Sequence, residues 1–287
     1  MANRLRIAVQ KSGRLLDDSI DLLKNCGIKI DNSKDQLKAH ARNFPIEVYY
    51  LRNSDIPKYI NDGVADIGIL GNNTVLEKQK ELDMVLPLGF SKCRLSIATP
   101  KGIAYTGPEW LNGKKIATSY RHSLQQYLDQ KGLQADIHEI SGSVEIAPNI
   151  GLADAICDLV SSGSTLYKNG LEEQEIILQS EAWIVANKSL PTEIRSILDK
   201  LVFRIKSVLE AKNNKYLLMN APNNKVKDII KILPGMKSPT VMPLADGNWS
   251  SIHTVIAEDS FWDIIEELKS NGAQGILVVP IEKMIIN

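Results

Sequence analysis

The sequence predicts an α/β protein with a two-lobed core and a smaller C-terminal domain of βαββαβ order. Strand-like apolar runs alternate with amphipathic helical runs over the first two thirds of the chain. A junction of glycine, alanine and aspartate before an apolar strand occurs twice in that region, once in each half. A long amphipathic helix that stops at Asn213-Asn214 then separates residues 215–287 from the rest.

The first lobe is expected over residues 1–92. Its strand-like runs are 4–10, 46–52 and 65–71. A helix after the first run stops at Gly27. A second helix opens at Ser54-Asp55-Ile56-Pro57, with a cap and an early proline, and closes at Gly63. Because strands that alternate with helices form βαβ units, we expect a largely parallel sheet.

The pattern restarts in a second lobe, residues 93–179. We expect strands at 93–100, 114–120 and 135–140, and helices at 121–132 and 143–152. A further strand lies within GLADAICDLVSSGSTL, residues 151–166. The segment from about 180 to 212 returns to the first lobe and ends in a helix at 192–212.

The C-terminal domain is expected over residues 215–287. Its strands are expected at 215–222, 240–244, 250–257 and 275–281, with helices at 225–235 and 260–272. Ser260 would cap the second helix and Gly272 would stop it. This order predicts a split βαβ sandwich.

The repeated junction reads NDGVADIGILG at 61–71 and IGLADAICDLV at 150–160. Gly63 and Gly151 would be left-handed helix stops, and Asp66 and Asp154 would sit where the chain enters the next strand. Two explanations stay open. The lobes have related architecture with a ligand cleft between them, or ordinary turn chemistry simply occurs twice.

Composition excludes several classes of function. Lys+Arg and Asp+Glu are both 34, so a neutral chain argues against nucleic-acid and membrane partners. No apolar run approaches the roughly 20 residues of a membrane span, and the start does not read as a signal peptide, so we expect a cytoplasmic protein. The three cysteines and four histidines have no metal-ligand spacing, so no metal site built by the protein alone is expected.

The segment GLADAICDLVSSGSTL predicts a sugar-phosphate site. Period-2 alternation puts Asp154 and Asp158 on one strand face, leading toward the carboxyl end, where ligands of α/β sheets bind. The loop that follows supplies small donors and a glycine, which suits a phosphate: Ser161, Ser162, Gly163, Ser164 and Thr165. Carboxylates beside a phosphate cradle can accept hydrogen bonds from ribose hydroxyls. The alternative is a serine-rich surface turn.

A second anion cluster is QKSGRL, residues 10–15. Lys11 and Arg14 flank Ser12-Gly13 where a strand meets a helix, and helix N-terminal amides attract anions. Pyrophosphate or a triphosphate fits such a cluster. The alternative is a basic helix start on the surface, although that runs against the helix dipole.

Together these motifs resemble a known family. QKSGRL, DGVADIGILG, CRLSIATP, GKKIATSY, GSVEIAP, GLADAICDLVSSGSTL and a tail ending ILVVPIEKM occur in this order over essentially the whole chain. The set resembles the long form of ATP phosphoribosyltransferase, of histidine biosynthesis. The resemblance implies a periplasmic-binding-protein-like catalytic core and a ferredoxin-like, ACT-like regulatory domain. The short form lacks that domain and relies on a separate regulatory subunit, which is not expected here.

The resemblance implies transfer of the phosphoribosyl group of phosphoribosyl pyrophosphate to N1 of ATP, with inversion at C1 and with Mg²⁺ brought by the substrates. It favours Lys11 and Arg14 as catalytic residues that hold pyrophosphate or ATP phosphates, with Ser12 and Gly13 beside them. It adds Glu145 to the candidates for the ribose. Arg52, Arg94 and Tyr120 are weaker candidates for nucleotide contact, since an arginine at a strand end is commonly in a surface ion pair.

The resemblance also implies feedback inhibition by histidine and a homo-hexamer. In the C-terminal domain, Asn220 is a candidate for the amino group of histidine, and Ser238 and Thr240 for its carboxylate or imidazole. Met236 and Val255 are candidates for the pocket wall, with core packing as the alternative, and Gly275 would leave room for close backbone approach.

Two other classes of protein share parts of this plan. A two-lobed solute-binding module with a regulatory tail does not need two anion clusters and commonly carries a secretion signal. Prephenate dehydratase has a similar plan, but its Thr-Arg-Phe motif is absent from the sequence.

Overall fold

The computed structural model describes residues 3–31, 37–235 and 238–286. The chain divides into two compact units, one of residues 1–24 and 28–198 and the other of residues 25–27 and 199–287. Met236, one of the predicted effector residues, lies outside the described residues.

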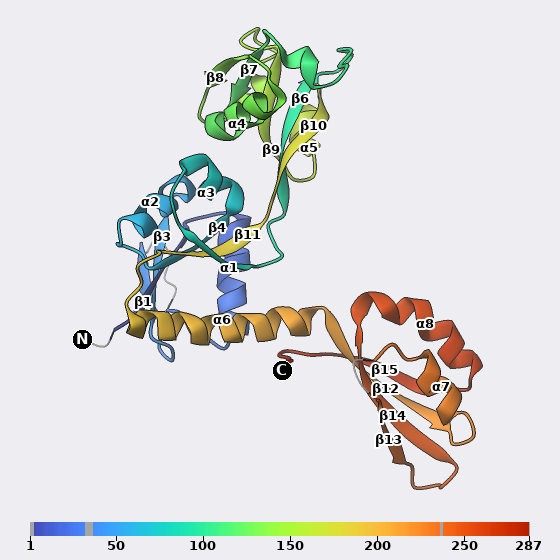
Figure 1. Ribbon diagram of the computed structural model, residues 1–287. Helices are drawn as coiled ribbons and strands as arrows, with labels where there is room; N and C mark the ends of the chain where they lie inside the picture. The colour runs from blue at the N-terminus through green and yellow to red at the C-terminus, as the bar shows by residue number, and fades with distance from the viewer. Residues whose placement is uncertain (1–2, 32–36, 236–237, 287) are drawn as a thin grey trace. The chain divides into compact units, whose positions relative to one another are not determined.

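The first unit contains two sheets, and each forms the centre of one lobe (Figure 1). Lobe I has the strand order β2-β3-β1-β4-β11-β5. Its strands are β1 (Leu5–Gln10), β2 (Lys38–His40), β3 (Ile46–Leu51), β4 (Ile67–Gly71), β5 (Asp83–Pro87) and β11 (Ala182–Ala186). Its helices are α1 (Arg14–Asn25), α2 (Ile56–Asn61) and α3 (Asn72–Lys78), and a 3₁₀ turn, η1 (Asn53–Asp55), precedes α2. Strand β1 is the centre of the lobe, because its apolar side chains are buried on both faces.

Lobe II has the strand order β10-β6-β9-β7-β8. Its strands are β6 (Cys93–Pro100), β7 (Lys115–Thr118), β8 (Asp136–Glu139), β9 (Ala155–Val160) and β10 (Leu171–Ser180). Its helices are α4 (Arg121–Lys131) and α5 (Ser164–Lys168), with 3₁₀ turns η2 (Pro108–Leu111) and η3 (Val144–Ile146). Ile156 and Cys157 on opposite faces of β9 are both fully buried, so β9 has a packed core on each side.

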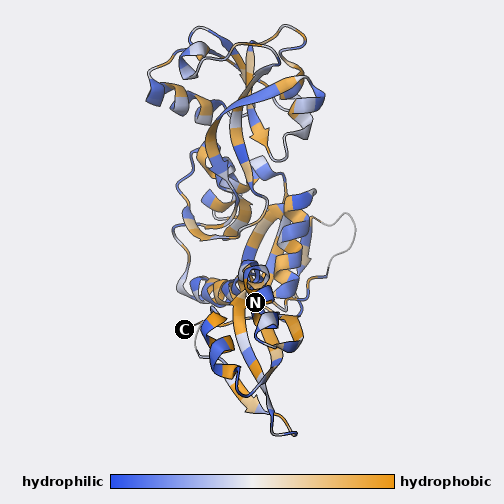
Figure 2. Ribbon diagram, turned by 90° about the vertical axis from the view of Figure 1, so that its right-hand side faces the viewer, coloured by the Kyte–Doolittle hydropathy of each residue, from blue (hydrophilic) through white to orange (hydrophobic). Residues whose placement is uncertain are grey.

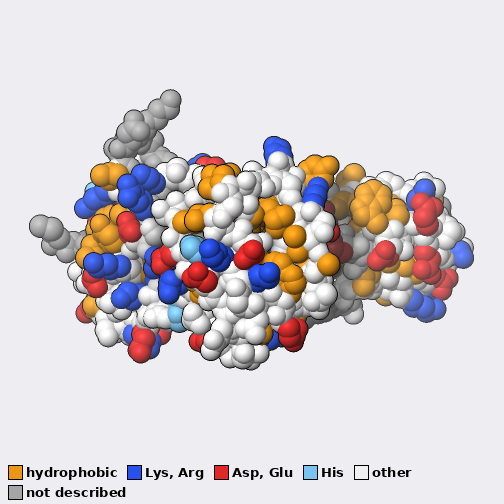
Figure 3. Space-filling view, turned by 90° about the horizontal axis from the view of Figure 1, so that it is seen from above, with side chains coloured by type: hydrophobic (Ala, Val, Ile, Leu, Met, Phe, Trp, Pro, Cys, Tyr) orange, Lys and Arg blue, Asp and Glu red, His pale blue; other side chains and the backbone are white. Residues whose placement is uncertain are grey.

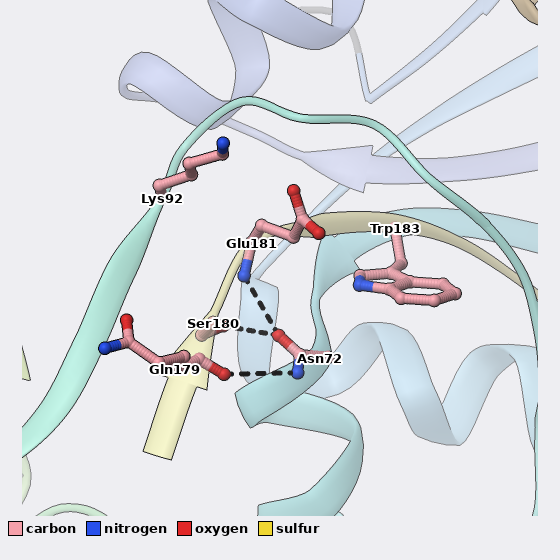
Figure 4. A pocket seen from close by; sticks show the side chains of 6 residues that line it. All are labelled: Asn72, Lys92, Gln179, Ser180, Glu181 and Trp183. Carbon is pink, nitrogen blue, oxygen red and sulfur yellow. Dashed lines mark hydrogen bonds between the residues drawn. The ribbon is translucent and has the colours of Figure 1, made fainter. Parts of the chain in front are cut away.

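Two connections join the lobes, one between β5 and β6 and one between β10 and β11. Asn72, at the start of α3, fixes the second connection (Figure 4). Its side chain accepts hydrogen bonds from Ser180 Oγ (2.7 Å) and the Glu181 amide (3.0 Å), and its amide group donates to the Gln179 carbonyl (3.4 Å). The same residues, with Lys92 from the first connection and Trp183, line a cavity of about 280 Å³. The polypeptide that links the lobes is therefore anchored to lobe I.

The sheets are mixed, which corrects the expectation of a largely parallel sheet. The central pairings β1–β3, β1–β4, β7–β8 and β7–β9 are parallel, while β2, β5, β6, β10 and β11 pair antiparallel. Strands β2, β5, β10 and β11 had not been predicted. In β10 charged and apolar residues do not alternate regularly, and much of the strand is only half-buried, so its sequence lacks the usual strand pattern.

Three local predictions were also wrong. The helix expected at 143–152 is only the short turn η3, because Pro148 and Gly151 interrupt the segment. Asp55 makes no side-chain capping hydrogen bond to α2. Ser260 lies inside the first turn of α8 (Glu258–Ser270), whose N-cap is Ala257.

The repeated junctions have the same geometry in the two lobes. Gly63 and Gly151 are both left-handed, with φ of 70° and 73°. Asp66 donates its amide to the Arg6 carbonyl (2.9 Å), and its carboxylate accepts from the Arg6 amide (2.7 Å). Asp154 makes the same exchange with Lys115, at 2.8 and 2.9 Å. Each aspartate therefore joins the start of one strand to the neighbouring parallel strand.

The second unit carries the C-terminal domain. Helix α6 (Thr192–Lys212) leads into β12 (Asn214–Pro222), α7 (Val226–Ile232), β13 (Thr240–Pro243), β14 (Trp249–Ala257), α8 and β15 (Gln274–Pro280). The sheet is antiparallel, in the order β13-β14-β12-β15. Leu217, Met219, Ile252 and Ile256 pack with α7 and α8 residues in its core, and Figure 2 shows apolar positions along these strands.

Within the described residues, no helix is long and apolar enough to cross a membrane. The face seen in Figure 3 carries acidic and basic side chains interspersed. That distribution agrees with the formal net charge of zero.

Candidate functional site

Cationic side chains gather at the carboxyl ends of β1 and β3. Lys11 follows β1 and donates its amide to the Leu51 carbonyl at the end of β3 (2.8 Å), so Arg52 begins beside it. Gly13 has φ +88° and lets the chain turn sharply into α1, which starts at Arg14. Lys11, Arg14 and Arg52 are exposed. The predicted basic cluster is therefore open to an anionic ligand at the carboxyl ends of the parallel strands β1 and β3.

The hydroxylic loop follows β9 in lobe II. Ser161 and Ser162 form a bend, and Gly163 has φ +77° and precedes α5. Ser164 and Thr165 belong to the first turn of α5, although the sequence predicted them as loop. Ser162 Oγ donates to Ser164 Oγ at 3.1 Å, so two hydroxyls of the segment lie together. The bend thus presents backbone amides and hydroxyls in one short stretch, which suits a phosphate group.

A direct hydrogen bond links the two clusters. Arg14 Nη2 in lobe I donates to Ser161 Oγ in lobe II at 3.2 Å, across 147 residues of sequence. Both side chains are exposed. The basic cluster and the hydroxylic loop therefore lie next to each other within the first unit.

Arg94 is hydrogen-bonded to the hydroxylic loop and to a glutamate of β10. Its Nε and Nη2 donate to the two Glu173 oxygens, both at 2.5 Å, and its Nη1 donates to the Ser161 carbonyl at 3.1 Å. Ser96 Oγ donates to the same carboxylate at 2.7 Å. Arg94 therefore joins the loop to Glu173, and its expected contact with the nucleotide stays a prediction. Glu173 had not been predicted, because β10 carries several glutamates with no pattern that singles one out.

Asp158 lies close to Glu145 and Tyr120 within lobe II. Burial, followed by the charge of Glu145, raises the pKa of Asp158 to about 6, against a hydrogen bond from the Leu159 amide that lowers it. Burial, followed by the charge of Asp158, raises the pKa of Tyr120. These three predicted residues are therefore near one another, just before the hydroxylic loop.

The structure contradicts the placement of Asp154. This residue precedes β9, whereas Ser161 follows it, so a strand of 6 residues separates the two. At about 3.3 Å per residue that separation is roughly 20 Å, longer than a ribose phosphate. The Asp154 carboxylate instead accepts from the Lys115 amide. Its role is structural, as the comparison with Asp66 indicates.

A cavity of about 380 Å³ lies between the lobes beside Arg52. Lobe I contributes Asn53, Ser54, Thr74 and Lys78, and lobe II contributes Ser119, Tyr120, Glu139, Ile140, Ser141 and Gly142. Asn53 donates from its amide to Thr74 Oγ1 (3.0 Å), and its buried Oδ1 has no hydrogen-bond partner in the described part of the chain. Apart from Tyr120, sequence reasoning missed this set. Many of its members follow carboxyl ends of strands, which is the signal that would have found them.

Three of the predicted effector residues share one face of the C-terminal sheet. Asn220 pairs with Ser251, Thr240 with His253, and Val255 with Tyr216, so these positions lie on the face opposite the helices. A Cβ on Gly275 would lie 3.5 Å from Asn220 Nδ2, and Ser238 is exposed just before β13.

His253 lies in the middle of that face and had not been predicted. Its ring nitrogens are hydrogen-bonded to Tyr216 Oη (2.8 Å) and Ser251 Oγ (2.9 Å). A lone histidine in a strand carries no sequence signal for such a position.

Comparisons with known proteins agree with this architecture. A sequence model of ATP phosphoribosyltransferase matches residues 52–207, and one described as the HisG C-terminal domain matches residues 211–283. An ATP phosphoribosyltransferase of Cytophaga hutchinsonii is 55% identical over 99% of this chain and 100% of its own. One of Parabacteroides distasonis is 55% identical over 98% of this chain and 100% of its own.

Solved structures agree with the family and with the fold of the two-lobed core. The ATP phosphoribosyl transferase (HisG:HisZ) complex from Thermotoga maritima contains a chain that is 32% identical, with a TM-score of 0.60, covering 70% of this chain and 98% of that one. A histidine kinase sensor domain with similarity to periplasmic binding proteins shares the fold, at 12% identity and a TM-score of 0.50 over 73% of this chain and 93% of that one. The chain therefore belongs to the ATP phosphoribosyltransferase family, in the long form that carries the C-terminal domain.

Proposed function

We propose that this enzyme joins N1 of ATP to C1 of phosphoribosyl pyrophosphate in the cleft between the lobes, releasing pyrophosphate and forming phosphoribosyl-ATP, the first step of histidine biosynthesis. The observation that carries the site assignment is the hydrogen bond from Arg14 to Ser161, 147 residues away. It brings a cationic cluster and a phosphate-binding type of loop within reach of one substrate that has a phosphate at each end.

The ribose 5-phosphate is assigned to lobe II. Ser161, Ser162, Gly163, Ser164 and Thr165 would hold the phosphate through backbone amides and hydroxyls. Asp158, with Glu145 near it, would accept hydrogen bonds from the ribose hydroxyls. Because only Leu159 and Val160 separate Asp158 from this segment, one molecule of ribose phosphate would span both groups.

The leaving pyrophosphate is assigned to lobe I. Lys11, Arg14 and Arg52 supply positive charge, and Ser12 and Gly13 lie at the start of α1, which favours anions. Neutralising the charge that develops on the leaving group lowers the barrier, so we assign Lys11 and Arg14 the catalytic role.

The cavity beside Arg52 is assigned to the adenine of ATP. Asn53 gives the cavity a polar side chain, and Tyr120 offers an aromatic surface to the base. Lys78, which also lines the cavity, offers a positive charge to the phosphates of ATP. With these assignments, the nucleophilic ring nitrogen and the ribose would occupy neighbouring parts of the region between the lobes. Holding two reactants in line supplies much of the rate.

Mg²⁺ is assigned to the substrates. The described residues contain no group of three or more His, Cys, Asp or Glu side chains able to hold a metal ion alone. We therefore assign an ion held chiefly by substrate phosphates, and Glu145 and Asp158 are the acidic side chains of the assigned ribose site. When bound, the ion would neutralise negative charge on pyrophosphate.

Regulation is assigned to the C-terminal domain. Histidine would bind on the sheet face that carries Asn220 and Thr240, with Ser238, Val255 and Gly275 around it. Because residues 211–283 match the HisG C-terminal domain, we expect no separate regulatory subunit. A homo-hexamer that works in the cytoplasm completes the proposal.

Pyrophosphate release tests the reaction. The full-length protein, given ATP, phosphoribosyl pyrophosphate and Mg²⁺, should release pyrophosphate in equal amount to phosphoribosyl-ATP, and added histidine should slow both. Release without any adduct of ATP would mean hydrolysis and would overturn the proposal. A rate that histidine leaves unchanged would overturn only the regulatory part.

A further inference from the structure

The lobes make a second contact beside the cavity, through a carboxylate that no step above uses. Glu77, in the last turn of α3 in lobe I, accepts three hydrogen bonds from the first turn of α4 in lobe II. The donors are the His122 amide (2.9 Å), the Ser123 amide (3.0 Å) and Ser123 Oγ (2.8 Å). The Gln79 side chain also lies against the His122 ring, 2.9 Å from its Nε2.

Glu77 acts as the cap of a helix in the other lobe. The first amides of a helix lack partners within the helix and carry partial positive charge, so a carboxylate stabilises them. Helix α4 has 11 residues, and its own N-cap residue, Tyr120, makes no side-chain capping hydrogen bond. Separating the lobes at this point would remove the cap from the helix.

This contact lies next to both walls of the adenine cavity. Tyr120 precedes α4 and Lys78 follows Glu77, and both line the cavity. The charge of Glu77 is one of the causes that raise the pKa of Tyr120, after burial and Asp158, so the carboxylate is near that ring. The position of α4 against Glu77 therefore fixes the spacing of the two walls.

We propose that Glu77 is a positioning residue that holds the lobes at the spacing required for transfer between the two substrates. It touches neither substrate, and it acts through the first turn of α4 and through Tyr120. The inference rests on the proposed function, because it takes one substrate subsite from each lobe. Misplacement of one lobe relative to the other would misalign ATP and the ribose, which costs rate even when each subsite is intact.

The kinetic test compares Glu77→Gln and Glu77→Ala with Glu81→Gln. Glu81 is a matched control, since it is an exposed lobe I carboxylate that pairs with Lys188 and not with α4. We expect kcat/KM to fall about tenfold in Glu77→Gln and further, by on the order of a hundredfold, in Glu77→Ala. The control should stay within about twofold of wild type. Ribose 5-phosphate, whose assigned phosphate and ribose contacts are in lobe II, should bind all variants with an unchanged Kd.

A coupling measurement separates this role from general stability. Ser123→Ala should lower kcat/KM in the wild-type background and have no further effect in Glu77→Ala, because its partner is already gone. Kinetics equal to wild type in Glu77→Ala, measured well below its unfolding temperature, would overturn the proposal even if its Tm were lower.

The distance between the lobes tests the contact without enzymatic activity. Spin labels at Lys58→Cys in lobe I and Gln130→Cys in lobe II, with Cys93→Ser to remove the half-buried thiol, report the spread of separations. We expect a broader distribution in Glu77→Ala than in wild type, and an unchanged one in Glu81→Gln. An unchanged distribution in Glu77→Ala would overturn the proposal, whereas a broader one in a protein without transferase activity would overturn only the proposed function.

Discussion

Arg14 Nη2 lies 3.2 Å from Ser161 Oγ, with each residue on a different lobe. Arg14 begins α1 at the edge of the lobe I sheet, and Ser161 follows β9 at the edge of the lobe II sheet. The guanidinium thus lies at the junction between the two assigned phosphate positions. A bound phosphoribosyl pyrophosphate would take over this interaction, because an anionic oxygen is a stronger acceptor than a hydroxyl.

Removing the Arg14 side chain is expected to lower kcat more than it weakens substrate binding. Arg14→Ala deletes the cation that faces developing charge on pyrophosphate, and kcat should fall about a hundredfold. Ser161→Ala keeps the backbone amide and should lower kcat by less than about tenfold. Steady-state kinetics with both substrates varied would measure this, and an unchanged kcat in Arg14→Ala would exclude the assigned role.

Asp158 is expected to make stability depend on pH. Burial raises its pKa to about 6 in the folded protein, so the folded state keeps a proton that the unfolded chain has already lost. The stability from this group is therefore full below the ordinary aspartate pKa and is lost as the pH rises through about 6. Asp158→Asn should raise the free energy of unfolding by about 2 kcal/mol at about pH 8 and by less than about 0.5 kcal/mol at about pH 4. Urea unfolding at the two pH values measures the difference, and an equal effect at both would contradict the assigned pKa.

The same carboxylate is expected to set the acid limb of activity. Only ionised Asp158 accepts hydrogen bonds from both ribose hydroxyls, so kcat/KM for phosphoribosyl pyrophosphate should rise through about pH 6 in wild type. Asp158→Asn should be slow at every pH, by about a hundredfold at its plateau. A wild-type profile without a limb near this pH would remove Asp158 from the ribose site.

Arg94 and Glu173 are expected to affect substrate binding through the loop. Lysine at position 94 keeps the charge but cannot hold Glu173 by two hydrogen bonds and the Ser161 carbonyl by a third. Arg94→Lys and Glu173→Gln should each raise KM for phosphoribosyl pyrophosphate about tenfold, with a smaller change in KM for ATP. Arg195→Lys, in the looser pair with Asp83 (3.7 Å), is the matched control. Equal changes in both KM values would indicate a general structural defect.

The paired junction aspartates are expected to affect stability and not catalysis. Asp66 is buried and receives two side-chain hydrogen bonds from Arg6, at 3.0 and 2.6 Å, so Asp66→Asn should lower the free energy of unfolding by about 2–3 kcal/mol. Asp154 is exposed, so Asp154→Asn should cost less than about 1 kcal/mol and leave KM within about twofold. A tenfold rise in KM for phosphoribosyl pyrophosphate in Asp154→Asn would return this residue to the ribose site.

Local patterns explain which elements the sequence could predict. Strand β1 and helix α6 have strong apolar periodicity, and Gly132 closes α4 with a left-handed residue, as expected. Strand β10 was missed because its LEEQEIILQS sequence mixes charges with apolar residues on a half-buried strand. Such a segment forms a strand because of its neighbours in the sheet and not because of its intrinsic strand propensity.

The residues of the candidate site were likewise predictable only where their chemistry is local in the sequence. The loop around Gly163 and the cluster around Gly13 could be predicted, because their chemistry lies within a few neighbouring residues. Asp154 was misplaced because period-2 alternation identifies the face of a strand but not which end meets the ligand. The contact of Glu173 with Arg94 spans 79 residues and that of Glu77 with His122 spans 45, so tertiary pairing alone creates them.

A crystal structure of the enzyme with phosphoribosyl pyrophosphate and Mg²⁺ tests the site assignment most directly. The 5-phosphate should accept hydrogen bonds from backbone amides between Ser161 and Thr165, the ribose hydroxyls should meet Asp158, and the pyrophosphate should contact Lys11 and Arg14. A ligand bound elsewhere, for example in the cavity beside Trp183 or with its 5-phosphate on the basic cluster, would contradict the account.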